Sequence, residues 1–498
     1  MGFMASSKHW SFLTMLVFHL FCMSVLAFAL PITNITSTVP VDFAAKLNTS
    51  DSAWTLIPHE FSVWLSDNCT LEMHWQHIGR ELPIARHLKS FNAYHIDFIV
   101  TDAANSIEHE DEVLALIRSD PNVKMLSQNS FTQLDLATDF SPLTPSDRAR
   151  FHSSVQSNRS SHNDRLETIS HQDNAPWNLR QLSADVQFPD EREPYYYIAS
   201  AGAGVDVYIL DTGIHYDLAN KHSDRFSYAP TFIGGEENYV SFDVVAILVA
   251  VADRRQDLNG HGTHVAGIVG SALYGVCKSC NIISVKVANK TGQLNSRAAV
   301  DGIEWVLDDN KDKMKKTGYK GAVINASWAT VGKESQDNRD VRHAVNRADR
   351  AGIALVAAAG NTAEDPNKAE LYPALSGKAI SVAGSLEDRR YYSKSGWGDR
   401  VDIIAPASVP SYYVDENINL VEGYLMTGTS MAAPHVAGVI AIYMGHEGPL
   451  STKKARKRLM ANVDKDYIID VHPKTDNKFV NSGCLKHNPY VDAPHDEL

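Results

Sequence analysis

Short apolar segments alternate with helix-like stretches along residues 177–462. The predicted strands are residues 205–210, 282–287, 322–327, 353–358 and 379–384. The predicted helices are residues 263–274, 296–308, 339–351, 431–445 and 452–462. Continuously apolar strands that alternate with helices are typical of a parallel sheet covered on both faces. We therefore expect an α/β fold, a doubly wound parallel sheet whose ligands bind at the carboxyl ends of the strands.

An earlier region has a different pattern. Strands are predicted at 60–65, 94–100 and 123–127, with helices at 71–79 and 110–118. This order predicts a small α+β domain of roughly 75 residues, within residues 57–135. Residues 136–175 are rich in polar side chains and Pro, so we expect an exposed linker that is open to proteolysis.

The two ends of the chain carry targeting signals. An apolar run from Trp10 to Ala29 follows Lys8 and ends in an A-x-A pattern, which predicts a signal peptide at 1–29, with a signal anchor as the alternative. A polar leader, 30–56, follows. The last segment, 466–498, ends in HDEL, an address read by an endoplasmic reticulum receptor. We expect a lumenal protein of the secretory pathway, with the vacuole or secretion as alternatives.

Composition adds limits to this picture. The 498 residues carry a net charge of −13, so nucleic acid is excluded as an expected partner. Cys277 and Cys280 form a C-x-x-C, for which either a local disulfide or a bridge to Cys484 is expected. Sequons suited to a lumenal protein place expected glycans at Asn34, Asn48, Asn68, Asn158 and Asn289.

Ser430 is the first candidate for chemistry. It lies in Gly428–His435, where small residues lead directly into an apolar helix with Pro434 in its expected first turn. A serine here lies beside backbone N–H groups that lack helical partners, which suits a nucleophile and an oxyanion site. The alternative is a serine that only caps the helix.

Three further polar residues stand at predicted strand ends or helix starts. His261 is flanked by glycines, Asp211 ends a strand, and Asn361 follows another. An aspartate can orient a histidine base, and an asparagine amide can donate to an oxyanion. His264 makes an H-x-x-H pair with His261, but a zinc site lacks a third ligand nearby. The chain order Asp, His, Ser is the subtilisin order.

The segments around these residues resemble the signatures of the subtilase family, and of its proteinase K branch in particular. Asp211–Gly213, Gly260–Gly267 and Gly428–Pro434 carry the resemblance, and Ala175–Leu179 resembles the start of a mature enzyme of that branch. The similarity extends over about residues 175–446. Residues 57–135 also resemble the inhibitory propeptide of these enzymes.

The resemblance implies a fungal-type zymogen of a serine endopeptidase with its catalytic domain at 176–465. Ser430 would attack the substrate carbonyl, His261 would act as base and acid, and Asp211 would orient His261. Asn361 and the Ser430 N–H would hold the oxyanion. Propeptide 57–135 would assist folding, inhibit the enzyme and be removed by a cut within 136–175. Polypeptides are the implied substrates, with broad specificity and an apolar preference, and the enzyme is expected to be a monomer that needs no cofactor for its chemistry.

The resemblance also implies substrate-binding and metal sites. The implied substrate-binding residues are Gly292, Ser327, Trp328, Ala329, Ala358 and Gly360. Trp328 and Ala329 replace smaller or more flexible family residues, which predicts a narrowed primary pocket. Asp402 matches a structural calcium ligand, with carbonyls near Gly377 and Ala379 as companions.

Two features leave alternatives open. The apolar run 244–252 looks inserted and has no assigned role. Together with the altered substrate edges and the HDEL tail, it supports a second hypothesis, a catalytically impaired peptide-binding protein of the endoplasmic reticulum lumen. A third is that residues 57–135 act mainly as a free protease inhibitor.

Overall fold

The computed structural model describes residues 54–98, 103–133, 139–146, 148, 169–184, 193–222, 224–233, 256–330 and 336–484. Several expectations fall outside these ranges: the signal peptide, the polar leader, the apolar run 244–252, the HDEL tail, and the sequons at Asn34, Asn48 and Asn158. In the part of the chain that is described, no helix combines the length and apolarity needed to cross a membrane.

A nine-stranded sheet forms the centre of the larger unit. Its strands are, in order, β18 (Asp464–Lys465), β19 (Lys478–Phe479), β15 (Ile403–Pro406), β14 (Ile380–Ser385), β13 (Ala354–Ala358), β12 (Gly321–Ala326), β8 (Val205–Asp211), β10 (Asn281–Lys286) and β9 (Phe226–Tyr228). Neighbours from β9 to β19 pair in parallel, and only β18 is antiparallel to its partner among these strands. The predicted α/β fold with a doubly wound parallel sheet is confirmed.

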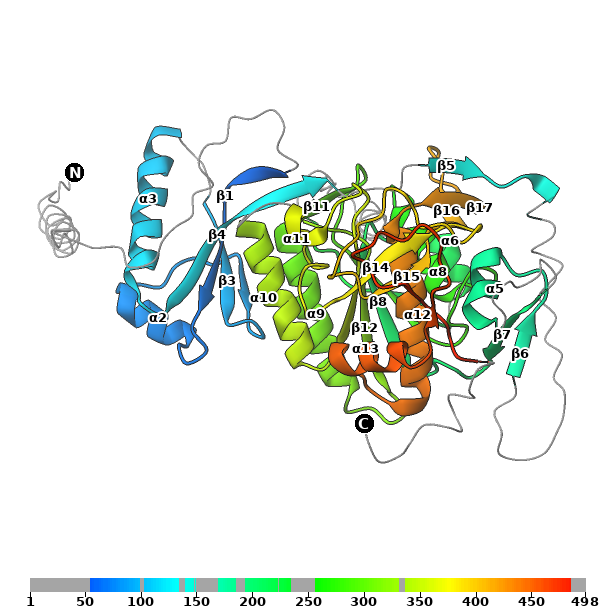
Figure 1. The fold of residues 1–498 in the computed structure, drawn as a ribbon. Helices are drawn as coiled ribbons and strands as arrows, with labels where there is room; N and C mark the ends of the chain where they lie inside the picture. The colour runs from blue at the N-terminus through cyan, green and yellow to red at the C-terminus, as the bar shows by residue number, and fades with distance from the viewer. Residues whose placement is uncertain are drawn as a thin grey trace, which may run out of the picture.

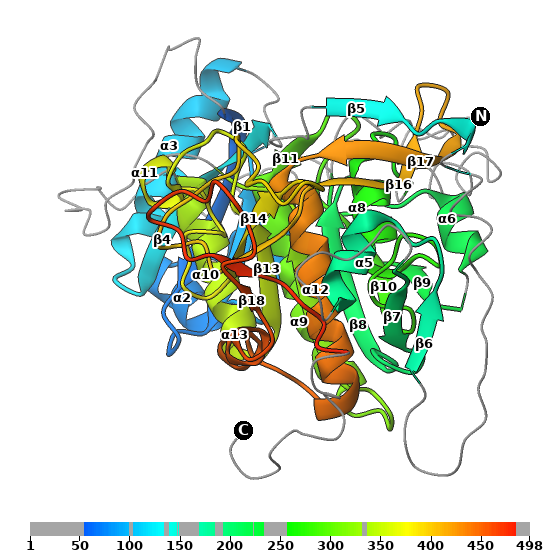
Figure 2. The ribbon, with the colours of Figure 1, turned by 45° about the vertical axis from the view of Figure 1, so that its right-hand side comes forward.

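Helices cover both faces of this sheet (Figures 1 and 2). They are α5 (Trp177–Ser183), α6 (Tyr216–Lys221), α8 (His261–Gly270), α9 (Ser296–Lys313), α10 (Gln336–Arg350), α11 (Pro366–Ala369), α12 (Thr429–Glu447) and α13 (Thr452–Met460). Side chains alternate along β8, so Val207 and Ile209 pack in one core with α8 and α12. Tyr208 and Leu210 pack in the other core with α9 and α10. Burial on both faces explains why these strands are continuously apolar.

A second, five-stranded sheet has the order β11-β4-β1-β3-β2. Its elements are β1 (Trp54–Leu65), α2 (Leu71–Ile78), β2 (Arg86–Leu88), β3 (Ala93–Asp97), α3 (Ala103–Ser119), β4 (Val123–Gln133) and, from the larger unit, β11 (Gln293–Asn295). One face packs its own core, with Val63 and Tyr94 against α2 and α3. The other face turns Trp64 and Ala93 toward α9 and α10. Figure 1 shows this sheet with α2 and α3 on one side and α9 and α10 on the other.

Two small sheets complete the described elements. Strand β5 (Asp139–Pro142) joins the hairpin of β16 (Ser408–Val414) and β17 (Leu420–Thr427), and β6 (Ile169–Gln172) pairs with β7 (Tyr195–Ile198). These strands, like β2, β9, β11 and β15, are absent from the sequence prediction. The predicted helix 263–274 is too long, because α8 ends at Gly270 and Ser271 is extended. Cys277 and Cys280 form the local disulfide, and Cys484 is a buried free thiol, so the alternative bridge is wrong.

Candidate active site

The candidate catalytic residues gather at the carboxyl edge of the central sheet. Asp211 ends β8, and Asn361 follows β13. His261 begins α8, and Ser430 lies in the first turn of α12. Because parallel strands end at the same edge, residues far apart in sequence meet there. Figure 2 shows α8 and α12 beside each other in front of these strands.

Asp211 and His261 form a buried pair. His261 Nδ1 lies 2.7 Å from Asp211 Oδ1, and the two residues are 1% and 0% exposed. A carboxylate only accepts, so the imidazole donates from Nδ1 and presents Nε2 as its basic nitrogen. The Thr212 N–H donates to the same carboxylate oxygen at 2.8 Å, which fixes the carboxylate in place.

The turn that carries His261 is organised by Asp257, a residue missed by the sequence analysis. Its buried carboxylate accepts bonds from the Asn259, Gly260 and Thr263 N–H groups, each at 2.9 Å. It also accepts from the hydroxyls of Thr212 and Thr263. Asp257 thereby links the start of α8 to the end of β8, the two elements that carry the pair. The signal that could have revealed it is an acidic side chain just before an Asn-Gly turn, where it can cap the helix that follows the turn.

Ser430 makes reciprocal bonds with Ser327. The Ser430 hydroxyl donates to the Ser327 carbonyl at 2.9 Å, and the Ser327 hydroxyl donates to the Ser430 carbonyl at 2.7 Å. Pro434 explains the second bond. It lies inside α12 and not in its first turn as expected, and it lacks the N–H that would otherwise bond the Ser430 carbonyl. Ser327 satisfies the carbonyl that Pro434 leaves without a helical partner.

Asn361 is oriented by Thr429. Its side-chain oxygen accepts from the Thr429 N–H at 2.8 Å and from the Thr429 hydroxyl at 3.1 Å. Two donors on one atom identify that atom as the amide oxygen, so the NH2 group points away from Thr429. The side chain is thus anchored to the residue that precedes Ser430, and its NH2 is the donor suited to an oxyanion.

The other buried histidines near the site are structural. His264 donates from Nε2 to the Tyr424 carbonyl at 2.8 Å, and burial lowers its pKa to about 3. His435 donates from Nδ1 to the Met431 carbonyl and accepts from Asn178, and burial lowers its pKa to about 3 as well. Within the described ranges no cluster of three or more His, Cys, Asp or Glu is arranged to hold a metal.

The implied substrate-binding residues fall into two groups: four lie near strand ends, and Trp328 and Ala329 have buried side chains. Gly292, Ser327, Ala358 and Gly360 lie beside β11 or at the ends of β12 and β13. Gly360 has a φ of 96°, and a Cβ there would lie 2.5 Å from Leu371 Cδ1, so any other residue would strain the backbone and displace the Leu371 side chain. The Ala329 side chain is buried.

Trp328 lies in the apolar core beside α9 and α10, and its indole N–H donates to the Leu210 carbonyl at 2.8 Å. The narrowing of a pocket by this residue stays a prediction.

The calcium prediction at Asp402 does not fit the structure. The guanidinium of Arg456 bonds the carboxylate of Asp402 and also the carbonyls of Gly377 and Ala379. The oxygens expected to surround an ion therefore surround a side-chain cation. Of the expected glycan sites that are described, Asn68 is exposed, whereas the Asn289 side chain accepts bonds from Thr291 and Gln293 within a turn.

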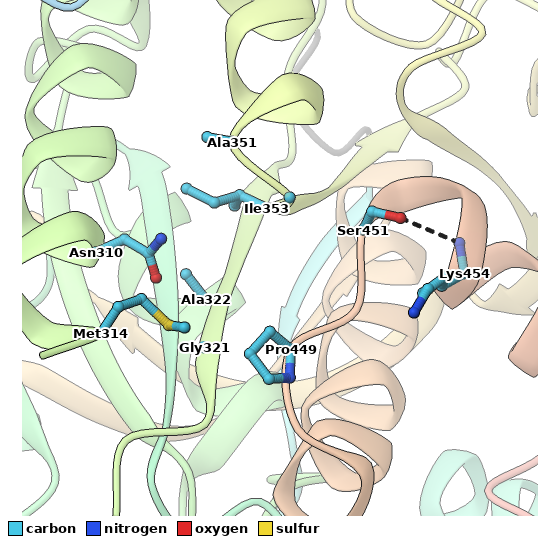
Figure 3. A pocket seen from close by; sticks show the side chains of 10 residues that line it. Asn310, Met314, Gly321, Ala322, Ala351, Ile353, Pro449, Ser451 and Lys454 are labelled. Carbon is cyan, nitrogen blue, oxygen red and sulfur yellow. Dashed lines mark hydrogen bonds between the residues drawn. The ribbon is translucent and has the colours of Figure 1, made fainter. Parts of the chain in front are cut away.

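A pocket of about 250 Å³ lies at the opposite edge of the sheet (Figure 3). It is lined by Asn310, Met314 and Pro449 beside Gly321 and Ile353, which lie at the amino ends of β12 and β13. The catalytic candidates lie at the carboxyl ends of the same strands. This pocket is therefore separate from the site.

Comparison with known proteins gives one consistent result. A model described as "Subtilase family" matches residues 202–482. Subtilisin-like protease 3 of Saccharomyces cerevisiae is 29% identical over 391 residues, which cover 75% of this chain and 68% of that protein. Cerevisin of the same yeast is 31% identical, with coverage of 63% and 47%, so the chain spans about half of that relative.

Two further matches cover a larger share of the matched protein than of this chain. Subtilisin-like serine protease Rho m 2.0101 of Rhodotorula mucilaginosa is 31% identical over 62% of this chain and 86% of its own length. A solved structure described as a cold adapted subtilisin-like serine proteinase matches with a TM-score of 0.50 and 27% identity. That match covers 62% of this chain and 98% of the other.

Proposed function

Because the chain belongs to the subtilase family of serine endopeptidases, we propose that it hydrolyses polypeptides through an acyl-enzyme on Ser430. The buried Asp211–His261 pair is the observation that carries this proposal, since it presents a basic Nε2 at the edge where Ser430 and Asn361 lie. Broad specificity with an apolar preference belongs to the same proposal. It rests on the resemblance to the family as a whole, because the substrate-binding strand departs from the family pattern at Trp328 and Ala329.

The chemical steps follow from these positions. The Ser430 hydroxyl turns from the Ser327 carbonyl toward His261 Nε2, gives up its proton and attacks the scissile carbonyl. Asp211 stabilises the imidazolium that forms. The Asn361 NH2 and the Ser430 N–H donate to the oxyanion, and His261 then protonates the leaving amine. Water hydrolyses the acyl-enzyme by the same route, so no cofactor enters the reaction.

We further propose that residues 57–135 keep the enzyme inactive as a zymogen. Support comes from strand pairing on both sides of the site. Strand β4 pairs with β11, directly after the implied substrate residue Gly292, and β5 pairs with β17, which runs into α12 and Ser430. The chain between β4 and β5 therefore has its two flanks held by strands next to the catalytic residues. We expect the first self-cleavage between these strands, near the start of the 136–175 linker.

Polar contacts support the inhibitory role of the same unit. His95 Nε2 lies 2.7 Å from Asp301 Oδ1, and Arg86 contacts both Asp301 and Glu304. The Asn129 side-chain oxygen accepts from the Arg297 N–H at 3.0 Å, at the start of α9. Buried, charged contacts of this kind favour a specific and lasting association.

The cellular setting is also a proposal. The signal peptide and HDEL tail support synthesis into the endoplasmic reticulum and retrieval there by an HDEL receptor, with later transport to the vacuole or secretion as the alternative. A monomer that carries its own inhibitor suits this route. Deleting residues 495–498 is expected to increase secretion, and an unchanged distribution would contradict retrieval.

One comparison tests the catalytic proposal. The intact chain and its Ser430→Ala variant are expressed and treated with a fluorophosphonate probe, and their fragments are measured by mass spectrometry. We expect labelling and self-cleavage of the first protein only. A folded, unmutated protein that neither labels nor cleaves would favour the second hypothesis, a peptide-binding protein whose Ser430 hydroxyl remains on Ser327. Release of an intact, inhibitory 57–135 fragment would support its proposed role.

A further inference from the structure

Four oxygens converge where the chain enters β14 and β15, in a group that we call the 402 cradle. It consists of the two carboxylate oxygens of Asp402 and the carbonyl oxygens of Gly377 and Ala379. Asp402 is tied into the sheet at this position, because its N–H donates to the Ser381 carbonyl at 2.9 Å and its Oδ2 accepts from the Ser381 N–H at 3.0 Å. Oxygen groups of this kind are what a calcium ion prefers.

The cradle already contains a cation, the guanidinium of Arg456 from α13. Arg456 Nε lies 2.7 Å from Asp402 Oδ1, and Nη2 lies 3.2 Å from Oδ2. Two donors on two carboxylate oxygens form the paired geometry in which arginine binds carboxylates best. Nη2 also lies 2.6 Å from the Ala379 carbonyl and 3.5 Å from that of Gly377.

A calcium ion and this side chain exclude each other. Calcium requires its oxygens at about 2.3–2.6 Å, so an ion bound to these four atoms would occupy the space of Nε and Nη2. The two cations would also repel each other at contact distance. The Arg456 and Asp402 side chains are only 27% and 23% exposed, so solvent weakens this repulsion little.

We propose that Arg456 is a built-in substitute for a metal ion, so that the 402 cradle binds no calcium in this protein. The same positive charge that an ion would bring joins β14, β15 and α13 without any dependence on calcium in the surroundings. The proposal implies a latent site. Removal of the Arg456 side chain leaves a carboxylate and two carbonyls that calcium can occupy.

Thermal unfolding of full-length chains tests this, with Ser430→Ala in every protein to prevent self-cleavage. The protein with Arg456 intact is expected to have the same Tm in chelator and in millimolar calcium. Arg456→Ala is expected to lower the Tm by several degrees in chelator, and calcium is expected to restore much of that loss, as binding to the native state requires. Magnesium should restore less, because it tolerates this irregular oxygen geometry poorly.

Matched variants locate the effect. Lys457→Ala removes an exposed charge from the same helix and should give neither the Tm loss nor the calcium response. Arg456→Ala combined with Asp402→Asn should lose the calcium response. If calcium raises the Tm of Arg456→Ala no more than that of the Arg456-containing protein, the latent site is refuted.

Calorimetric titration with calcium gives a second readout that does not need a stable Arg456 variant. If the Arg456-containing protein binds calcium and Asp402→Asn abolishes that binding, Arg456 does not replace the ion and the proposal is wrong. Calcium heat that Asp402→Asn leaves unchanged arises elsewhere and agrees with the proposal. Neither readout uses peptidase activity, so both are independent of the proposed function.

Discussion

At the scale of single residues, the site depends on side chains that hold other side chains. Thr429 anchors the Asn361 oxygen with its N–H and its hydroxyl, and that hydroxyl also accepts from the Gly360 N–H at 3.2 Å. Loss of one oxyanion donor typically costs about 10²–10³-fold in rate. Loss of a group that aims the donor should cost less, because the donor remains present.

Replacing Thr429 by Val should therefore lower kcat about tenfold, below the roughly 10²–10³-fold loss expected for deletion of a donor such as Asn361. KM should change little, because the oxyanion forms only after binding. The measurement is steady-state cleavage of a peptide substrate by the matured enzyme.

Thr429→Ser retains the hydroxyl and should recover most of the rate. Thr427→Val is the matched control, since the Thr427 hydroxyl bonds Ser408 and not Asn361. If Thr427→Val is as impaired as Thr429→Val, the proposed anchoring of Asn361 is wrong.

The four central candidates could be proposed from sequence because each stands in a recognisable local pattern. Asp257 was missed: its position before an Asn-Gly turn indicates only a cap for α8, whereas its bond to Thr212 joins the start of α8 to the end of β8, which is distant in the sequence. The Arg456–Asp402 pair was missed for a similar reason. Nothing near Arg456 in the sequence indicates that α13 reaches the loop before β14.

At the scale of elements, α12 shows how one irregularity is compensated by a neighbour. Pro434 removes a helical bond to the Ser430 carbonyl, and the Ser327 hydroxyl after β12 replaces it. The helix is otherwise buried along nearly its whole length. An unsatisfied carbonyl in such surroundings costs about 1–3 kcal/mol.

This compensation predicts a coupled pair of substitutions. Ser327→Ala should lower the free energy of unfolding by about 1–3 kcal/mol, because the Ser430 carbonyl then lacks a donor. Pro434→Ala restores a backbone N–H at the position that can donate to this carbonyl. In the double variant, the loss caused by Ser327→Ala should be much smaller than in the single variant.

Chemical denaturation of the four proteins of this cycle, all carrying Ser430→Ala, gives the interaction free energy directly. Additive losses would show that the two residues do not share the carbonyl.

Sequence patterns were most reliable for elements whose partners are local or continuously buried. The central strands and α9, α10, α12 and α13 were recognised, with ends shifted by a few residues. The short strands β5, β9 and β11 were missed, because each exists by pairing with a distant strand and has no apolar pattern of its own. Strand β2 pairs with its neighbour β3 and was missed because it is only three residues long. Tertiary pairing, and not local preference, forms these strands.

At the scale of the whole molecule, the contact between the two units contains titratable groups. Burial raises the pKa of Glu304 to about 7, and the neighbouring Asp301 and Asp308 act in the same direction, whereas Arg86 and the Ser90 N–H oppose it. Burial lowers the pKa of His95, although Asp301 opposes that shift. The two groups therefore have opposite effects on the association as the pH changes.

The effect of Glu304 can be isolated with Glu304→Gln. Ser90 and Arg86 of the first unit contact Glu304, and we expect separation to expose its carboxyl and return its pKa from about 7 toward the ordinary value of 4.5. On that basis the protonated form favours association. Relative to the Gln variant, the unmutated complex should be equally tight near pH 4.5. It should become weaker by an order of magnitude or more as the pH rises through about 7.

The measurement is the delay between self-cleavage and the onset of activity at each pH, for both proteins. The His95 contribution is common to both and cancels in their ratio. A ratio that does not change between pH 4.5 and 8 would contradict the assignment. The lower limit is the ordinary pKa of Glu304, and the upper limit lies about one unit above its pKa in the intact chain.

The pairing of β4 with β11 also bears on what becomes of the first unit after the release that we propose. While the chain is intact, β4 lies inside a sheet, with β1 on one side and β11 on the other. Departure leaves β4 as an edge strand with a row of unpaired N–H and C=O groups, the usual starting point for aggregation. We expect a fragment with such an exposed edge to be degraded soon after separation. Its degradation prevents rebinding and makes activation irreversible.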